Sequence, residues 1–80
     1  MKSTYTAEYQ KMLAKIVAAR KAAGITQAML AQRIGRPQSF ISKIENGERR
    51  LDLIEFLEIA RQIGLSPSEV LEDGQIGINK

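Results

Sequence analysis

QAMLAQRIGRPQSFISKIEN, residues 27–46, decides the fold, because its apolar residues recur at helical spacing on either side of one glycine. We predict one helix over residues 26–34, with a threonine N-cap, and a second over residues 37–45, which begins at a proline. Gly35 lies between them and can adopt a positive φ angle, which ends the first helix and redirects the chain. The stretch therefore predicts two short helices joined by a tight turn.

Each of the two helices has an apolar inner face. The inner positions are Leu30, Ile34, Ile41 and Ile44. They are three or four residues apart within each helix, so they hold the pair at a fixed angle, and Ala31 at the bend has to be small. The outer positions of the second helix are Gln38, Ser39, Ser42 and Lys43. This face carries no carboxylate before Glu45, which suits it to the groove of a polyanion.

At these residues the chain resembles the Cro/CI-type helix-turn-helix family of phage and bacterial repressors, also called the XRE family. The resemblance covers about residues 16–71 and rests on ITQAMLAQRIG, on ISKIENG and on LEIARQIGLS downstream. The three motifs are specific when taken together, because the small residue Ala31, the turn glycine Gly35 and the inward apolar residues all fall at the positions that the family motif requires. It implies an all-α fold: a compact bundle of five helices, lambda-repressor-like, in which helices 2 and 3 form the helix-turn-helix.

Composition favours one small domain without catalytic chemistry. The 80 residues are 44% hydrophobic and include neither Cys nor His. The usual zinc ligands and the commonest general base are therefore missing, so we expect no enzyme activity, no metal and no cofactor. No apolar run approaches the roughly 20 residues of a membrane span, and the start of the chain lacks a signal-peptide apolar region. We expect a cytoplasmic protein that does not bind membranes.

The charge is unevenly distributed along the chain. Residues 1–50 hold ten Lys or Arg and three Glu, a net charge of +7, whereas residues 51–80 hold two basic and six acidic residues, a net charge of −4. The basic half coincides with the two short helices. This asymmetry is typical of a protein that offers one face to phosphates and keeps its rear acidic.

The rest of the chain predicts a scaffold around this pair. A first helix is expected over residues 6–23, a fourth over residues 53–63 and a short fifth over residues 67–72. Asp52 and Glu55 form a D-x-x-E signature for the start of the fourth helix. That helix has too many apolar positions for one stripe, so part of its surface should meet the C-terminal segment or a second subunit.

We expect three regions: a flexible N-terminal tail over residues 1–5, the helix-turn-helix DNA-binding domain over residues 6–72 and a C-terminal tail over residues 73–80. The tail is a possible dimerisation segment. The residues expected to contribute to a dimer interface are Val70, Leu71, Ile76 and Ile78. In the alternative interpretation, the first two only cap the core and the tail is disordered.

The docking geometry of the motif places the recognition helix in the major groove, N-terminus first. Gln38 is the leading candidate for base contact, because its amide can donate and accept at once and so match adenine. Ser39 and Ser42 can bond to several bases or to phosphate, and Lys43 can reach guanine or a phosphate. Phe40 has two possible roles: half-buried packing, or contact with a thymine methyl group.

The expected phosphate contacts are Gln27, Arg36, Asn46, Arg49 and Arg50. Gln27 combines a side-chain amide with a helix N-terminus. Arg36 stands where the family often has a hydroxyl cap, and its guanidinium cannot cap the helix in that way. The resemblance places Arg49 and Arg50 on a loop beside the DNA backbone; the alternative is a solvated charged turn.

One structural ion pair is implied by the resemblance. In the family, an arginine at the position of Arg20 commonly pairs with a glutamate at the end of the recognition helix, which is Glu45 here. We expect this pair to be partly buried and bidentate. The alternative is two independent surface charges.

Two functions remain open. The first is sequence-specific double-stranded DNA binding by a homodimeric transcriptional regulator, a repressor, at a pseudo-palindromic operator. The alternative is an antitoxin-like protein-interaction module, which would hold a protein partner and bind DNA for autoregulation. A stable self-dimer would favour the first. RNA binding is disfavoured, because no exposed aromatic platform is evident.

Overall fold

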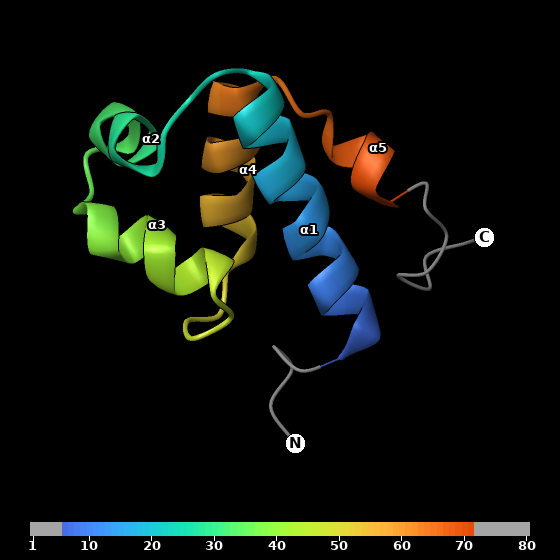
Figure 1. The fold of residues 1–80 in the computed structure, drawn as a ribbon. Coiled ribbons are helices and arrows are strands. Elements are labelled where there is room, and N and C mark those ends of the chain that lie inside the picture. Colours follow the sequence, from blue (N-terminus) through green and yellow to red (C-terminus); the bar gives the residue numbers. More distant parts are fainter. Residues whose placement is uncertain (1–5, 72–80) are drawn as a thin grey trace.

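The computed structural model describes residues 6–71, which form five α-helices and no strand. The helices are α1 (Ala7–Ala22), α2 (Gln27–Ile34), α3 (Gln38–Glu45), α4 (Leu53–Ile63) and α5 (Pro67–Leu71). Figure 1 shows α1 and α4 at the centre, with α2 and α3 to one side and α5 to the other. None of these helices is long and apolar enough to cross a membrane. The expected all-α bundle of five helices is confirmed, and both expected tails lie outside the described residues.

Side-chain caps begin three of the helices where the sequence predicts them. Thr6 and Thr26 each accept a hydrogen bond on Oγ1 from the amide three residues on, at 3.1 and 3.0 Å. At α4 the capping box is complete: Asp52 Oδ1 accepts from the Glu55 amide at 2.8 Å, and Glu55 Oε1 accepts from the Asp52 amide at 3.1 Å. The start of each of these three helices is therefore fixed by contacts between residues within one helical turn.

The α3 helix begins one residue later than the sequence predicts. Pro37 has a φ of −65° and a ψ of 153°, so it is the N-cap and not the first helical residue. The proline ring restricts φ but leaves ψ free to be extended. No side chain caps α3 by a hydrogen bond.

The turn between α2 and α3 depends on Gly35, which has a φ of 71° and a ψ of 34°. The amide of Arg36 donates to the carbonyl of Ala31 at 2.9 Å. This hydrogen bond satisfies a carbonyl of the last turn of α2 and ends the helix. Ala31 is 2% exposed, so it lies in the core beside this bend. The α2 helix then packs against both α3 and α4.

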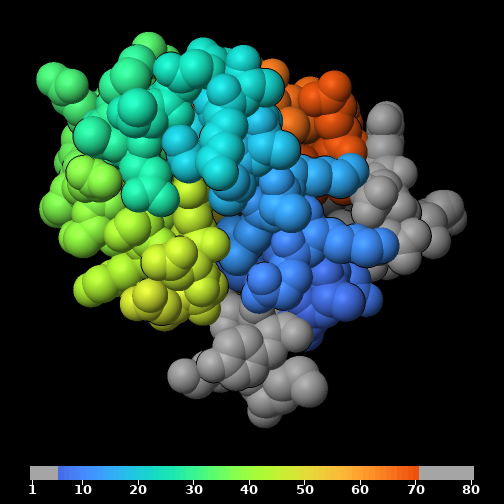
Figure 2. Space-filling model, in the orientation of Figure 1, coloured from blue at the N-terminus to red at the C-terminus, as the bar shows by residue number. Residues whose placement is uncertain are grey.

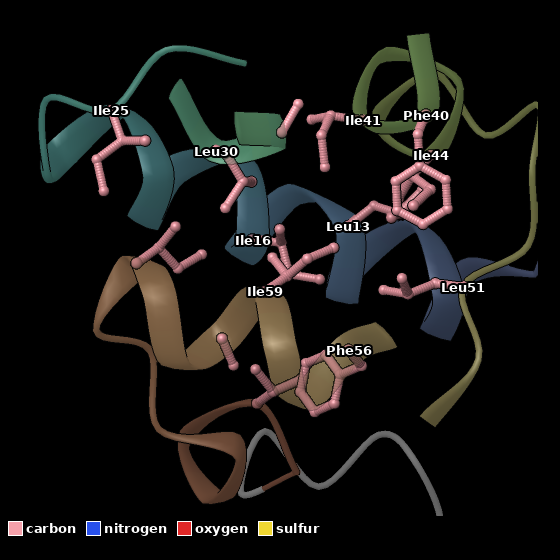
Figure 3. Close-up of a cluster of buried hydrophobic side chains, with 14 residues drawn as sticks. Leu13, Ile16, Ile25, Leu30, Phe40, Ile41, Ile44, Leu51, Phe56 and Ile59 are labelled. Carbon is pink, nitrogen blue, oxygen red and sulfur yellow. The ribbon is translucent and has the colours of Figure 1, made fainter. Parts of the chain in front are cut away.

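One hydrophobic core, mostly aliphatic, joins all five helices and two connecting loops (Figure 3). Its buried residues are Leu13, Ile16, Ile25, Leu30, Ala31, Phe40, Ile41, Ile44, Leu51, Phe56, Ile59, Ala60, Ile63 and Val70. Three of the four predicted inner positions of α2 and α3 are among them, and Ile34 packs against the cluster while partly buried. The core therefore holds the two short helices from behind.

The apolar surface of α4 divides in two. One side is buried in the core, while Leu53 and Ile54 at the start of the helix are 69% and 63% exposed. Val70 of α5 is only 2% exposed, so the expectation that it contributes directly to a dimer interface is wrong. It caps the core instead, because α5 folds back over the helical bundle. The side chain of Leu71, together with Ile76 and Ile78, lies outside the described residues.

We expect Gly35→Ala to lower the free energy of unfolding by about 1–2 kcal/mol, because alanine is strained at positive φ. A Cβ built at this position meets no atom within 4 Å, so the loss is due to the backbone alone. Gly35→Asn should lose less, since asparagine tolerates this conformation better. Urea denaturation measures both, and an alanine variant as stable as the unmodified chain would contradict the left-handed turn.

Candidate nucleic-acid interface

The two faces of α3 differ sharply in exposure. Gln38, Ser39 and Lys43 are exposed, whereas Ile41 and Ile44 are each 1% exposed. Ser42 is half-buried, and its hydroxyl donates to the carbonyl of Ser39 at 3.2 Å. The side chains singled out on the sequence for base contact thus lie on the outer face, Phe40 excepted. Figure 2 shows α2, α3 and the following loop together on one side of the molecule, with α5 on the other.

Phe40 is part of the core and not of the outer face. It is 9% exposed, because it precedes Ile44 by one helical turn and shares its side of α3. The guanidinium carbons of Arg36 and Arg49 each lie 4.5 Å from the centre of its ring. The packing interpretation is therefore correct, and contact of Phe40 with a thymine methyl group is withdrawn.

The carboxylate of Glu45 connects α3 to two other helices. Arg20 of α1 donates to it through Nε at 2.6 Å and through Nη2 at 2.9 Å, which forms the expected bidentate ion pair. The two side chains are only 8% and 6% exposed. Arg20 Nη1 also donates to the carbonyl of Ile25 at 2.8 Å. A pair this buried and fully hydrogen-bonded fixes the orientation of the end of α3.

Gln27, expected to contact phosphate, has a structural contact that sequence reasoning missed. Its Nε2 donates to Glu45 Oε1 at 2.9 Å. One N–H and the carbonyl of its amide remain for another partner. The two residues are 18 positions apart, so no local pattern indicates that they meet.

A second carboxylate, that of Glu55, lies close to both of the arginines that flank Phe40. Arg49 binds it in bidentate fashion, with Nη1 and Nη2 at 2.9 and 3.0 Å from its oxygens, and Arg36 Nη1 lies 4.0 Å away. Glu55 is 9% exposed, whereas both arginine side chains are 40% exposed. The sequence indicated Glu55 only as a capping residue. Its second role, as the partner of Arg49, was missed.

The remaining two predicted phosphate contacts are more loosely held. Asn46 Nδ2 is 3.5 Å from Glu48 Oε2, at the limit of a hydrogen bond. Arg50 is exposed, and residues 6–71 offer its guanidinium no hydrogen bond or ion pair. Of the five predicted phosphate contacts, three therefore lie against a buried carboxylate, whereas two are loosely held. The first group is Gln27, Arg36 and Arg49, and the second is Asn46 and Arg50.

The contact between Arg49 and Glu55 shifts the titration of both groups. The hydrogen bonds from Arg49 lower the pKa of the Glu55 carboxyl below its usual value, against a smaller opposing effect of burial. The Asp52 amide lowers this pKa further. In turn, the hydrogen bond to Glu55 raises the pKa of the Arg49 guanidinium. Both groups are therefore charged near neutral pH.

Comparison with known proteins identifies the family. A family model described as helix-turn-helix matches residues 16–70. A solved structure described as an XRE-family like protein from Pseudomonas syringae pv. tomato str. DC3000 is 52% identical over 91% of this chain and 89% of that chain, with a TM-score of 0.81. The chain belongs to the XRE family of helix-turn-helix proteins. A comparison with curated proteins gives no significant match.

The XRE family is one of DNA-binding regulators. The paired helices of the motif are α2 and α3, which pack against each other across the turn at Gly35. The match spans both helices, the loop after α3 and the whole of α4. Within residues 6–71, no three side chains are placed to hold a metal ion. What the described surface offers is a polar helix face beside several cationic side chains.

We expect Arg20→Met to lower the free energy of unfolding by about 3–5 kcal/mol, because it leaves the Glu45 carboxylate buried beside an apolar side chain. Urea denaturation measures the loss. The double variant Arg20→Met/Glu45→Met should recover part of it, since no buried charge remains. Arg33→Met, at an exposed arginine of α2, is the matched control, and an equal loss there would contradict a special role for the Arg20 pair.

The lowered pKa of Glu55 predicts a contribution to stability that depends on pH. The contribution is fully present above the pKa of an unfolded glutamate, about 4.3, and is lost as the pH falls through the lower pKa of the folded state. Glu55→Gln should therefore flatten the fall in stability below about pH 4.3. Arg49→Met, which removes the main cause of the shift, should flatten the same part of the curve. Denaturation at a series of pH values measures this, and unchanged curves would contradict the Arg49 contact.

Proposed function

We propose that the chain is a cytoplasmic, homodimeric transcriptional repressor that binds a pseudo-palindromic double-stranded operator through α3. The observation that carries this proposal is the contrast between the two faces of α3. Its inner face is buried in the core, and its exposed outer face carries amide, hydroxyl and ammonium groups without a carboxylate. Membership of the XRE family supports the same role.

Base recognition is assigned first to Gln38, which is the first residue of α3 and is exposed. A helix that enters the major groove N-terminus first brings this position closest to the base edges. The amide can pair with N6 and N7 of adenine. Ser39 and Ser42 supply less specific hydrogen bonds, and Lys43 is assigned to guanine or to a phosphate.

Phosphate binding is assigned to side chains on both sides of α3. Gln27 lies at the start of α2, where the amides of the helix N-terminus also favour an anion. Arg36 precedes α3, and Asn46, Arg49 and Arg50 follow it. These contacts would fix the register of α3 in the groove without reading sequence.

A homodimer is proposed because one recognition helix reads only a few base pairs. Two copies would place their α3 helices in half-sites about one DNA turn, roughly 34 Å, apart. The exposed Leu53 and Ile54 are apolar surface that a partner could cover. The same pair of residues also supports the second candidate, an antitoxin-like module with autoregulatory DNA binding. A chain that stays monomeric in sedimentation equilibrium until another protein is added would favour this second candidate.

Selection from random duplex oligonucleotides tests the assignment of Gln38. We expect Gln38→Ala to lose preference at one position in each half-site, a discrimination worth about 1–3 kcal/mol, while it keeps non-specific binding. Gln32→Ala, at an exposed glutamine of α2, is the matched control and should select the same sites as the unmodified chain. If Gln38→Ala retains the full preference, the assignment is wrong. If the unmodified chain fails to bind any duplex in dilute salt, DNA binding itself is wrong.

A further inference from the structure

The guanidinium of Arg49 has five N–H donors, and its hydrogen bonds within residues 6–71 come from Nη1 and Nη2 alone. Nη1 donates to Glu55 Oε1 at 2.9 Å and to the carbonyl of Arg50 at 3.1 Å. Nη2 donates once, to Glu55 Oε2 at 3.0 Å. The hydrogen bonds within residues 6–71 therefore leave two donors of Arg49 unused: the Nε–H and the second N–H of Nη2.

These two remaining donors have a useful geometry. They lie parallel on one edge of the planar guanidinium, at the edge that Glu55 does not bind. A pair of parallel N–H groups is the arrangement that binds two oxygens of a carboxylate or phosphate. The Arg49 side chain is 40% exposed, so solvent reaches part of it. Arg49 thus has one fork occupied by a protein carboxylate and a second fork unoccupied.

The carboxylate that holds Arg49 is itself fixed. Glu55 Oε1 accepts the Asp52 amide at 3.1 Å as part of the capping box of α4, and the Glu55 side chain is 9% exposed. The ring of Phe40, 4.5 Å from the guanidinium carbon, supports Arg49 from a second direction. The plane of the guanidinium is therefore restricted before any ligand binds.

The charge near Phe40 favours an anion. Arg36 and Arg49 both lie 4.5 Å from the ring centre, and Glu55 is the carboxylate within 4.0 Å of both. The two guanidinium charges exceed the single charge of Glu55; Asp52 also acts on Arg49 electrostatically, and the exposed Arg50 follows directly in the chain. Glu55 therefore orders this cluster without neutralising it.

We infer that Glu55 is a positioning residue for DNA binding: it holds Arg49 by one edge, so that the Nε and Nη2 fork of Arg49 is preorganised for a single backbone phosphate. The inference rests on the proposed function and adds to it a residue that does not itself touch DNA. Preorganisation reduces the side-chain entropy lost when the phosphate binds. The opposite account is that Glu55 competes with phosphate for Arg49, and the two accounts predict opposite effects of removing its charge.

The first test uses Arg49→Lys, which keeps the charge and removes the fork. A lysine ammonium is a point charge and cannot present parallel forks to a carboxylate and a phosphate together. Fluorescence anisotropy with a labelled duplex should show binding about tenfold weaker, as expected for one hydrogen-bonded charge. The slope of log affinity against log salt should stay nearly unchanged, because the lysine keeps the charge that neutralises the phosphate. Arg33→Lys, on the exposed surface of α2, should bind within about twofold of the unmodified chain.

The second test removes the charge of Glu55. Glu55→Gln keeps an oxygen that can accept the Asp52 amide, so the capping box of α4 is retained and the variant should fold. We expect this variant to bind DNA more weakly, although it has lost a negative charge. In the Glu55→Gln background, Arg49→Lys should weaken binding by only about twofold, since the two residues act as a unit.

Three results would overturn the inference while leaving the proposed function intact. The first is tighter binding by Glu55→Gln, which would make Glu55 a competitor of phosphate. The second is an equal loss in Arg50→Lys and Arg49→Lys, which would show that charge in the loop matters and the fork does not. The third is a loss in Arg49→Lys that does not depend on Glu55. If the unmodified chain binds no duplex, the proposed function is rejected as well.

Discussion

The carboxylate of Glu45 ties three helices together, and the direction in which α3 faces depends on it. It accepts hydrogen bonds from Arg20 of α1 and from Gln27 of α2. A buried carboxylate without such partners would be strongly unfavourable, so alternative arrangements of α3 that separate these groups are disfavoured. Aliphatic packing holds α3 to the core, but packing between similar side chains tolerates small rotations. The polar contacts specify one orientation.

The second carboxylate, Glu55, is nearly as buried as Glu45 and uses the same chemistry, but its arginine partner is far more exposed. Each of the two binds one arginine in bidentate geometry, yet Arg20 is 8% exposed and Arg49 is 40% exposed. The Arg20 guanidinium also donates to the Ile25 carbonyl, so donors on both its edges are occupied. Arg49 keeps two parallel donors and solvent access. Burial thus separates an arginine that stabilises the fold from one that suits a ligand.

The residues at the start of α3 form a local arrangement that differs from a side-chain cap. Pro37 is the N-cap and makes no side-chain hydrogen bond. Arg36, just before it, lies over the ring of Phe40 and near Glu55. The loop after α3 brings Arg49 to the same ring. The two ends of α3 are thereby connected through one aromatic side chain, which couples the entry to α3 with the loop that follows it.

The sequence by itself determined the elements whose causes lie within one helical turn: the caps at Thr6, Thr26 and Asp52, the turn at Gly35 and the apolar spacing that defines the inner face of α3. Each of these is a contact between near neighbours, so the residue types suffice to predict it. The resemblance to the XRE family added the partner of Arg20.

Only the tertiary structure decided which side chains meet across the chain. Phe40 lies at the border of the apolar stripe of α3, and in the fold it packs into the core beside Ile44, with Arg36 and Arg49 over its ring. Val70 belongs to the core because α5 folds back over the bundle. The contact of Gln27 with Glu45 joins residues far apart in the chain, and that of Arg49 with Glu55 depends on the path of the loop between α3 and α4. Such contacts depend on how helices dock, and periodicity within one helix carries no information about that.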